Sequence, residues 1–244
     1  MKRLFLGWML FCGVFLINFP ATWFSVKLLG WSEGHLKLSN ETGTLWQGSA
    51  EVNWLGNSQT VHWPGRVEWR LQPVWGGLRW SLHQADVQSH LDFSGQWRWG
   101  QGEWQPGQAE FPAALLDGLG SPFTTLHPSG LVDLHWGAAR WNGQGWQAPW
   151  TVDGIWMHAG TPMAPLSPLG DYEVRLMGGQ TGGHMTLVTH QGPLRLQGHG
   201  EESAGHFHFI GHAAVDPEDR VLLSGFLSIL GKPEGEGVRL EWSH

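Results

Sequence analysis

Apolar and polar residues alternate at every second position through most of the chain after residue 35. In the segment 66–71, for example, Val67, Trp69 and Leu71 alternate with Arg66, Glu68 and Arg70. A period of two is typical of a β-strand that has one buried face and one wet face. The pattern recurs at residues 78–82, 91–93, 173–176, 194–196, 206–209 and 238–242. The sequence therefore predicts an all-β domain.

Clusters of Gly, Asn, Asp and Pro separate these runs, and such residues are typical of hairpin turns. They lie at residues 40–43, 73–77, 99–102, 142–145, 178–183 and 217–219. This spacing predicts an antiparallel meander that forms a curved sheet, a sandwich or a partly open barrel. Two stretches interrupt the pattern: residues 112–119 are predicted to form one or two helical turns, and residues 154–170, with three prolines, an irregular crossover loop.

The chain has 36 glycines and 18 tryptophans, while only 14% of its residues are charged. A disordered chain would lack so many aromatic residues, so a folded domain is expected. The single cysteine, Cys12, lies near the N-terminus, so the β domain is expected to fold without a disulfide.

The N-terminus carries a long apolar run. Lys2 and Arg3 are followed by 23 residues, Leu4 to Val26, that contain no charge. A helix of that length covers about 35 Å, slightly more than the roughly 30 Å hydrocarbon core of a bilayer. A cleaved signal peptide would have a shorter apolar region and a small-residue cleavage site, which the surroundings of Ala21 do not provide.

We therefore predict one transmembrane helix within residues 1–30, with the N-terminus cytoplasmic because of Lys2 and Arg3. Residues 31–244 form the predicted β-rich domain outside the cytoplasm. The lipid bilayer would then be a partner through the N-terminal helix.

From residue 41 onward the chain has ten Lys and Arg residues against twenty Asp and Glu residues, a formal charge near −10. A net negative charge argues against nucleic acid and anionic lipid head groups as main partners.

Several motifs that carry catalysis or bind cofactors are missing from the sequence. It contains no H-E-x-x-H, no G-x-x-x-x-G-K-[ST] and no C-x-x-C. The alternative of a metal site would use His206 and His208, which share one strand face, with His199 and His212 nearby. We predict no catalytic, cofactor-binding or metal-ligating residue, and no enzyme activity.

The segment Gly43-Thr44-Leu45-Trp46-Gln47-Gly48 forms a compact motif. Its two glycines are expected to permit a tight turn on one side and a bulge or close backbone approach on the other. Trp46 is then interpreted as a core anchor. In the alternative interpretation Gly43, Thr44, Trp46 and Gly48 dock a partner.

Together with an N-terminal membrane segment, this motif resembles protein N of the type II secretion system, the general secretion pathway family. Further elements of the resemblance are the Trp-rich strand 67–71, Pro128-Ser129-Gly130, Pro168-Leu169-Gly170 and the closing segment 227–231. The resemblance implies an accessory inner-membrane component of the apparatus that exports folded proteins from the periplasm across the outer membrane. Its partners would be other components of that apparatus, namely inner-membrane platform subunits and the secretin. The family offers no catalytic residues.

Two function classes follow. In the first, the protein is an assembly component that binds through its anchor or its exposed sheet edges. In the second, the sheet is an open gutter, similar to the AsmA-like envelope proteins, whose apolar groove holds lipid or another apolar ligand.

Overall fold

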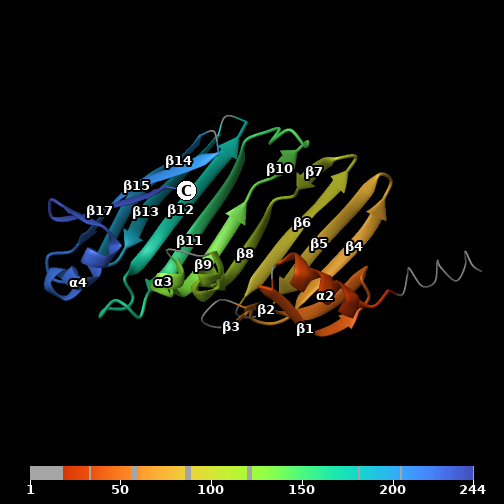
Figure 1. Cartoon of the computed structure of the whole chain (residues 1–244), viewed down its shortest axis with the longest axis horizontal. Coiled ribbons are helices and arrows are strands. Elements are labelled where there is room, and N and C mark those ends of the chain that lie inside the picture. The colour runs from red at the N-terminus through yellow and green to blue at the C-terminus, as the bar shows by residue number, and fades with distance from the viewer. Residues whose placement is uncertain are drawn as a thin grey trace, which may run out of the picture.

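The computed structural model describes residues 19–32, 34–55, 60–85, 89–119, 123–180, 182–203 and 205–243. Across these residues seventeen strands form a single sheet that does not close on itself. Figure 1 shows the sheet as one long layer, with α2 (Ala21–Trp31) near one end and α4 (Arg220–Leu230) near the other.

The strands follow one another along the chain, with three helical segments between them. The first half contains β1 (Leu36–Gly43), β2 (Gln47–Leu55), β3 (Thr60–His62), β4 (Val67–Val74), β5 (Gly77–Ala85), β6 (His90–Arg98), β7 (Gln101–Trp104) and β8 (Gly107–Pro112). The 3₁₀ helix η1 (Ala113–Leu119) and α3 (Phe123–Leu126) follow. The second half contains β9 (Ser129–Trp136), β10 (Ala139–Trp141), β11 (Trp150–Gly160), β12 (Gly170–Gly179), β13 (Gly182–Gln191), β14 (Leu194–Ser203), β15 (His206–Val215), α4, β16 (Lys232–Glu234) and β17 (Gly237–Ser243).

All strand pairs are antiparallel, and most strands pair with their neighbours in the chain, which confirms the predicted meander. The order across the sheet is β1, β2, β4, β5, β6, then the broken strands β8 with β7 and β9 with β10. It continues through β11, β12, β13, β14, β15 and β17 to β16.

Tight turns make this order possible. The β6–β7 turn consists of Trp99 and Gly100, which have φ angles of 51° and 77°. Two consecutive positive φ angles are the mark of a type I′ turn, whose twist matches that of the flanking strands.

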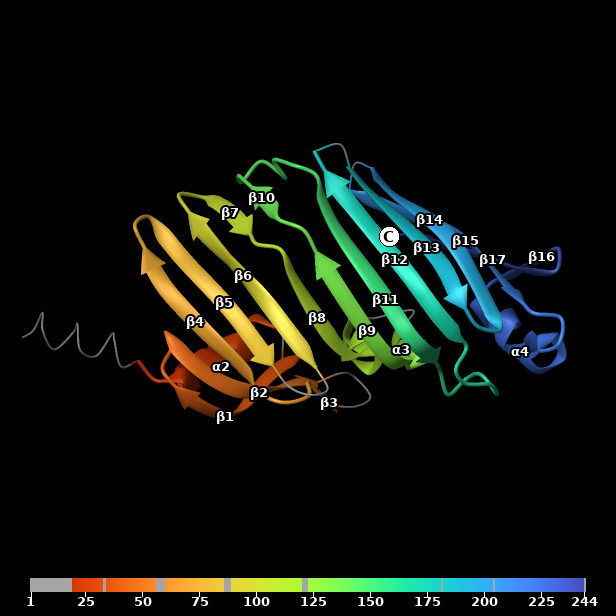
Figure 2. The same ribbon diagram turned by 180° about the vertical axis from the view of Figure 1, so that it is seen from behind.

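The register gives the sheet two chemically different faces. The apolar face carries side chains such as Trp69, Leu82, Phe93, Leu134 and Leu187, while the polar face carries the residues between them. Figure 2, which turns the molecule by 180°, presents the sheet from behind. The alternation predicted from the sequence thus continues without inversion from strand to strand.

Helices cover the apolar face at its two ends. At one end Ala21 of α2 packs with Leu38, Ala50 and Trp69 in a buried cluster. At the other end Leu223, Phe226 and Leu227 of α4 pack against a buried cluster that includes Ala213 and Val238. Between them η1 lies against β9, and its Ala113 is fully buried.

Several expectations need correction. The sheet is open, so neither a sandwich nor a closed barrel forms. The predicted loop at 154–170 is shorter, because β11 continues to Gly160 and β12 begins at Gly170. The helix α4 was not expected; Val221, Leu222 and Ile229 on its exposed side show that its apolar residues are not confined to the buried side.

The predicted membrane span, Leu4 to Val26, lies mostly outside the described residues. Its described end forms the start of α2, an 11-residue helix that begins directly after Pro20. Within the described ranges no helix is long and apolar enough to cross a bilayer.

We expect Leu223→Ala to lower the free energy of unfolding by about 2–5 kcal/mol. The side chain is fully buried on the inner side of α4, and its loss leaves a cavity. Urea denaturation of the full chain in detergent would measure the change. The matched control is Val221→Ala in the same helix, where the side chain is 89% exposed and little change is expected. Equal effects of the two substitutions would contradict the packing of α4.

Candidate functional site

Between α2 and α4, apart from the part of β9 on which η1 packs, the apolar face carries large side chains that no second layer of the described chain covers. Examples are Trp80, Phe93, Trp136, Trp150, Leu176 and Leu187, all of which are half-buried. The register places Trp136 opposite Val152, and Val152 opposite Leu176, so one apolar surface crosses β9, β11 and β12. We refer to this surface, on β5 to β14, as the central apolar face.

Aromatic rings contact one another along the central apolar face. The centroid of Trp104 lies 6.3 Å from that of Trp80 and 5.5 Å from that of Trp146. Trp146 in turn lies 5.7 Å from Trp150, and it belongs to the β10–β11 connection rather than to a strand. These separations are typical of favourable tilted and edge-to-face aromatic pairs. A continuous row of contacting aromatic side chains therefore extends from β5 to β11.

Aromatic side chains also lie flat over glycines of the neighbouring strands. Gly95 is opposite Trp80 in the register, and a Cβ atom added to it would be 2.5 Å from Trp80 Cζ2. Gly107 is opposite Trp136 in the same way, with a separation of 2.8 Å. Gly48 with Trp69 and Gly178 with Trp150 repeat the arrangement. Each indole can approach the backbone this closely only because its neighbour has no side chain.

Most charged residues of the strands lie on the polar face, and several of them form ion pairs. Arg175 binds Asp153 at 2.5 Å and Glu173 at 3.1 Å. Gln96, by a hydrogen bond, and then Arg140 lower the pKa of Glu103. These exposed pairs each contribute little stability, at most about 1 kcal/mol. Their effect is to neutralise the polar face locally.

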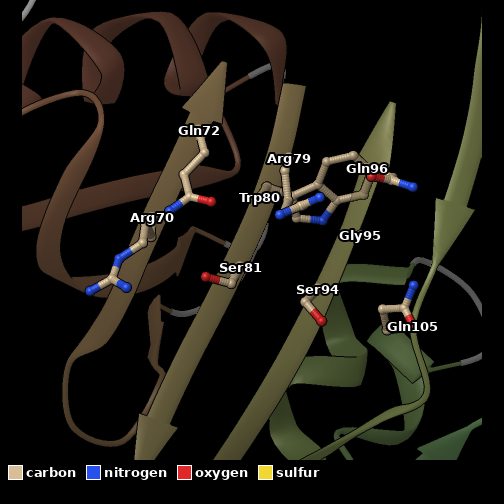
Figure 3. A pocket seen from close by; sticks show the side chains of 9 residues that line it. All are labelled: Arg70, Gln72, Arg79, Trp80, Ser81, Ser94, Gly95, Gln96 and Gln105. Carbon is tan, nitrogen blue, oxygen red and sulfur yellow. The ribbon is translucent and has the colours of Figure 1, made fainter. Parts of the chain in front are cut away.

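A shallow hollow of about 290 Å³ lies on the polar face between β4, β5 and β6. Figure 3 shows Ser81 and Ser94 within it, flanked by the guanidinium groups of Arg70 and Arg79. No histidine or carboxylate is among its lining residues, so neither serine has a general base beside it there. The hollow is suited to a polar contact rather than to nucleophilic chemistry.

The motif at residues 43–48 forms the turn between β1 and β2. Gly43 has a φ of 88° and pairs with Gly48, while the amide of Thr44 donates to the carbonyl of Gln47 at 2.8 Å. Trp46, interpreted from the sequence as a core anchor, is only half-buried in this turn. The buried indole is that of Trp69, 6% exposed, whose Nε1 donates to the carbonyls of Thr44 and Leu45. Trp69 thus fastens the motif to β4.

The histidines considered as metal ligands lie on the polar face of β14 and β15. His199 is opposite Ile210, and His212 is opposite Gln197. In the part of the chain that the structure describes, no three His, Cys, Asp or Glu residues are grouped closely enough to hold a metal ion.

Sequence reasoning interpreted the tryptophans first as core residues and kept the uncovered apolar face as the alternative of an open gutter. The sequence does contain a signal for the close contacts between indoles and backbone, because glycine and tryptophan are both abundant. The particular pairs, Gly95 with Trp80 and Gly107 with Trp136, can be identified only from the register of the strands.

Comparison with known proteins gives one match. The family model described as "Type II secretion system (T2SS), protein N" matches residues 34–241, which includes every strand of the sheet except the last two residues of β17. No curated protein and no solved structure matches the chain.

We expect Gly95→Ala to lower the free energy of unfolding by about 1–3 kcal/mol, because the added methyl group overlaps the indole of Trp80 and the Glu103 carbonyl. The matched control is Gly225→Ala in α4, where no atom lies within 4 Å and the substitution should stabilise the helix by about 0.5–1 kcal/mol. Urea denaturation measures both. Effects of the same sign would contradict the close approach of Trp80 to Gly95.

Proposed function

The chain belongs to the family of type II secretion system protein N, and from that premise we propose that it is an accessory, non-catalytic component that works by binding other proteins of the system. The family supports a role as a component of type II secretion and of protein transport. The proposal adds a single N-terminal span in the inner membrane, a cytoplasmic N-terminus and a β domain in the periplasm. The apolar run Leu4 to Val26 supports the anchor.

The observation that carries the protein-binding role is the open edge of β17. On its inner side β17 pairs with β15 from Val238 to Ser243. On its outer side β16 pairs only with residues 237–239, and no other described strand continues that pairing over residues 240–243. An open edge of this kind can accept the main chain of a partner as an additional strand.

The edge is protected along part of its length. Pro233 and Lys232 of β16 stand on the outer side of β17, and proline and lysine are residues that discourage strand addition. The stretch from Leu240 to Ser243 lacks this protection. A partner strand would therefore be restricted to one short segment, which favours a specific contact. Inner-membrane platform subunits and the secretin are the partners proposed.

We expect a photoreactive amino acid placed at Glu241 to form cross-links in cells with another component of the secretion system. Glu241 is exposed and lies on the open segment of β17. Mass spectrometry of the purified product identifies the component. The matched control is Gln197, which is also exposed on the polar face but lies in the interior strand β14. Products at Gln197 alone, or none at Glu241, would contradict strand addition at this edge.

A second candidate function is binding of a lipid or another apolar ligand on the central apolar face. The specific observation in its favour is the row of half-buried side chains from Trp80 to Leu187 without a covering layer in the described chain. Contiguous apolar surface of this kind usually marks a site of interaction. An acyl chain would meet aromatic and aliphatic side chains there, while the charges stay on the other face.

We expect native mass spectrometry of the full chain, released from mild detergent, to detect bound phospholipid that Leu187→Lys removes. Leu187 lies on the central apolar face, and its neighbour Val188, 52% exposed, lies on the polar face. Val188→Lys is therefore the matched control and should leave the lipid bound. A chain without lipid, or equal loss in both variants, would exclude this second function.

A further inference from the structure

The helix α4 has an outward surface that is apolar although the rest of the helix is already packed in the core. Leu223, Phe226 and Leu227 face inward and are buried. Val221, Leu222 and Ile229 are exposed by 89%, 50% and 54%. At 3.6 residues per turn, positions 221, 222, 225, 228 and 229 share the outward side of the helix. We call this set the α4 stripe.

The polar groups on and beside the α4 stripe are satisfied within the helix itself. Ser224 Oγ donates to the carbonyl of Val221 at 2.9 Å, and Ser228 Oγ donates to the carbonyl of Ser224 at 3.1 Å. Serine hydroxyls turned back onto the helix in this way leave its outer surface without donors for a partner or for water. The α4 stripe therefore exposes apolar side chains at positions 221, 222 and 229, with small residues at 225 and 228 between them.

Gly225 lies at the centre of the α4 stripe, and a Cβ atom at this position would meet nothing within 4 Å. Glycine inside an exposed helix costs about 1 kcal/mol relative to alanine, and no contact within the described chain requires it here. A small residue at this position, with serine at 224 and 228, allows the backbone of another helix to approach closely.

Acidic residues form a rim at the N-terminal end of the α4 stripe. Glu218 and Asp219 have no ion-pair partner among the described residues, and Glu236 pairs with Arg220 at 3.0 Å. An anionic membrane surface attracts helices with lysine and arginine at the rim, not carboxylates. A second copy would bring the same carboxylates together. The rim is complementary instead to basic side chains.

We propose that the α4 stripe is a docking site for an apolar helix of another protein that carries lysine or arginine at the end that meets Glu218 and Asp219. The stripe lies at the same end of the sheet as the open edge of β17, since α4 packs against β15 and β17. In Figure 1 this end is opposite the end that carries α2. The proposal rests on the proposed function and extends it, because it specifies that the partner binds through a helix with basic residues.

The test places a photoreactive amino acid at Val221, Leu222 or Ile229 of the full chain in cells. All three positions should cross-link to one segment of one protein, and its sequence, read by mass spectrometry, should be apolar with Lys or Arg at one end. The matched control position is Gln197 on β14, which is exposed on the polar face of the sheet, whereas α4 packs on the apolar face. Phospholipid adducts alone, links to a second copy, or no product at the three positions would overturn the proposal.

Gly225→Leu separates docking from folding. Leucine is a better helix former than glycine and meets no atom within 4 Å at its Cβ, so the melting temperature should stay the same or rise. The added side chain blocks close approach, so the yield of the Ile229 cross-link should fall about tenfold, equivalent to about 1.4 kcal/mol. An unchanged yield would overturn the proposal. A normal Glu241 product with no product at the α4 stripe would refute this inference while leaving the proposed function intact.

Discussion

Tryptophan lying flat over glycine is the contact on which this one-layer sheet depends. A sheet normally buries its apolar face against a second layer. Here the pairs of Trp80 with Gly95 and Trp136 with Gly107 bring indoles down onto the neighbouring backbone. An aromatic side chain that buries about 150–250 Å² gains several kcal/mol at about 25 cal/mol per Å². Part of the free energy of burying each indole is thus gained by contact with the neighbouring strand of the same sheet. The opposite side of the ring remains free to contact a partner or ligand.

At the two ends of the sheet the apolar face is buried differently, by helices that pack on small residues of the strands. Ala50 belongs to the cluster that α2 covers, and Ala213 to the cluster that α4 covers; both are almost completely buried. Alanine on the strand leaves room for a helix, whereas glycine leaves room for the indole of the next strand. The division explains why the central face is uncovered while both ends are packed. It also explains why removal of one large side chain should matter more under α4 than on its outer side.

Much of this fold could be predicted from local sequence, because strand alternation and turn residues are local signals. The meander and its polar face follow from runs such as 66–71, together with Gly and Asn turns. Three features depend on contacts between distant residues and could not be decided from local sequence. Whether the sheet closes or stays open, which the sequence left undecided, depends on where pairing stops, at the outer side of β17. The burial of Trp69 rather than Trp46 depends on the register between β2 and β4. The helix α4 was missed because Val221 and Ile229 on its outer side are as apolar as Leu223 on its inner side.

The apolar outer side of α4, which hid the helix in the sequence, is also the surface that a partner is most expected to cover. On the polar face, Arg175 is already engaged by Asp153 and Glu173, so a partner binding there would have to displace satisfied charges. On the central apolar face the indoles already cover the backbone, which reduces what a partner can add. The outer side of α4 has neither ion pairs nor indoles that cover its backbone. Its serine hydroxyls donate to carbonyls of the same helix, its glycine has no neighbour within 4 Å, and its large side chains are exposed to water. Because the exposed Val221, Leu222 and Ile229 leave water only when another molecule covers them, binding at this end of the molecule removes apolar surface from water.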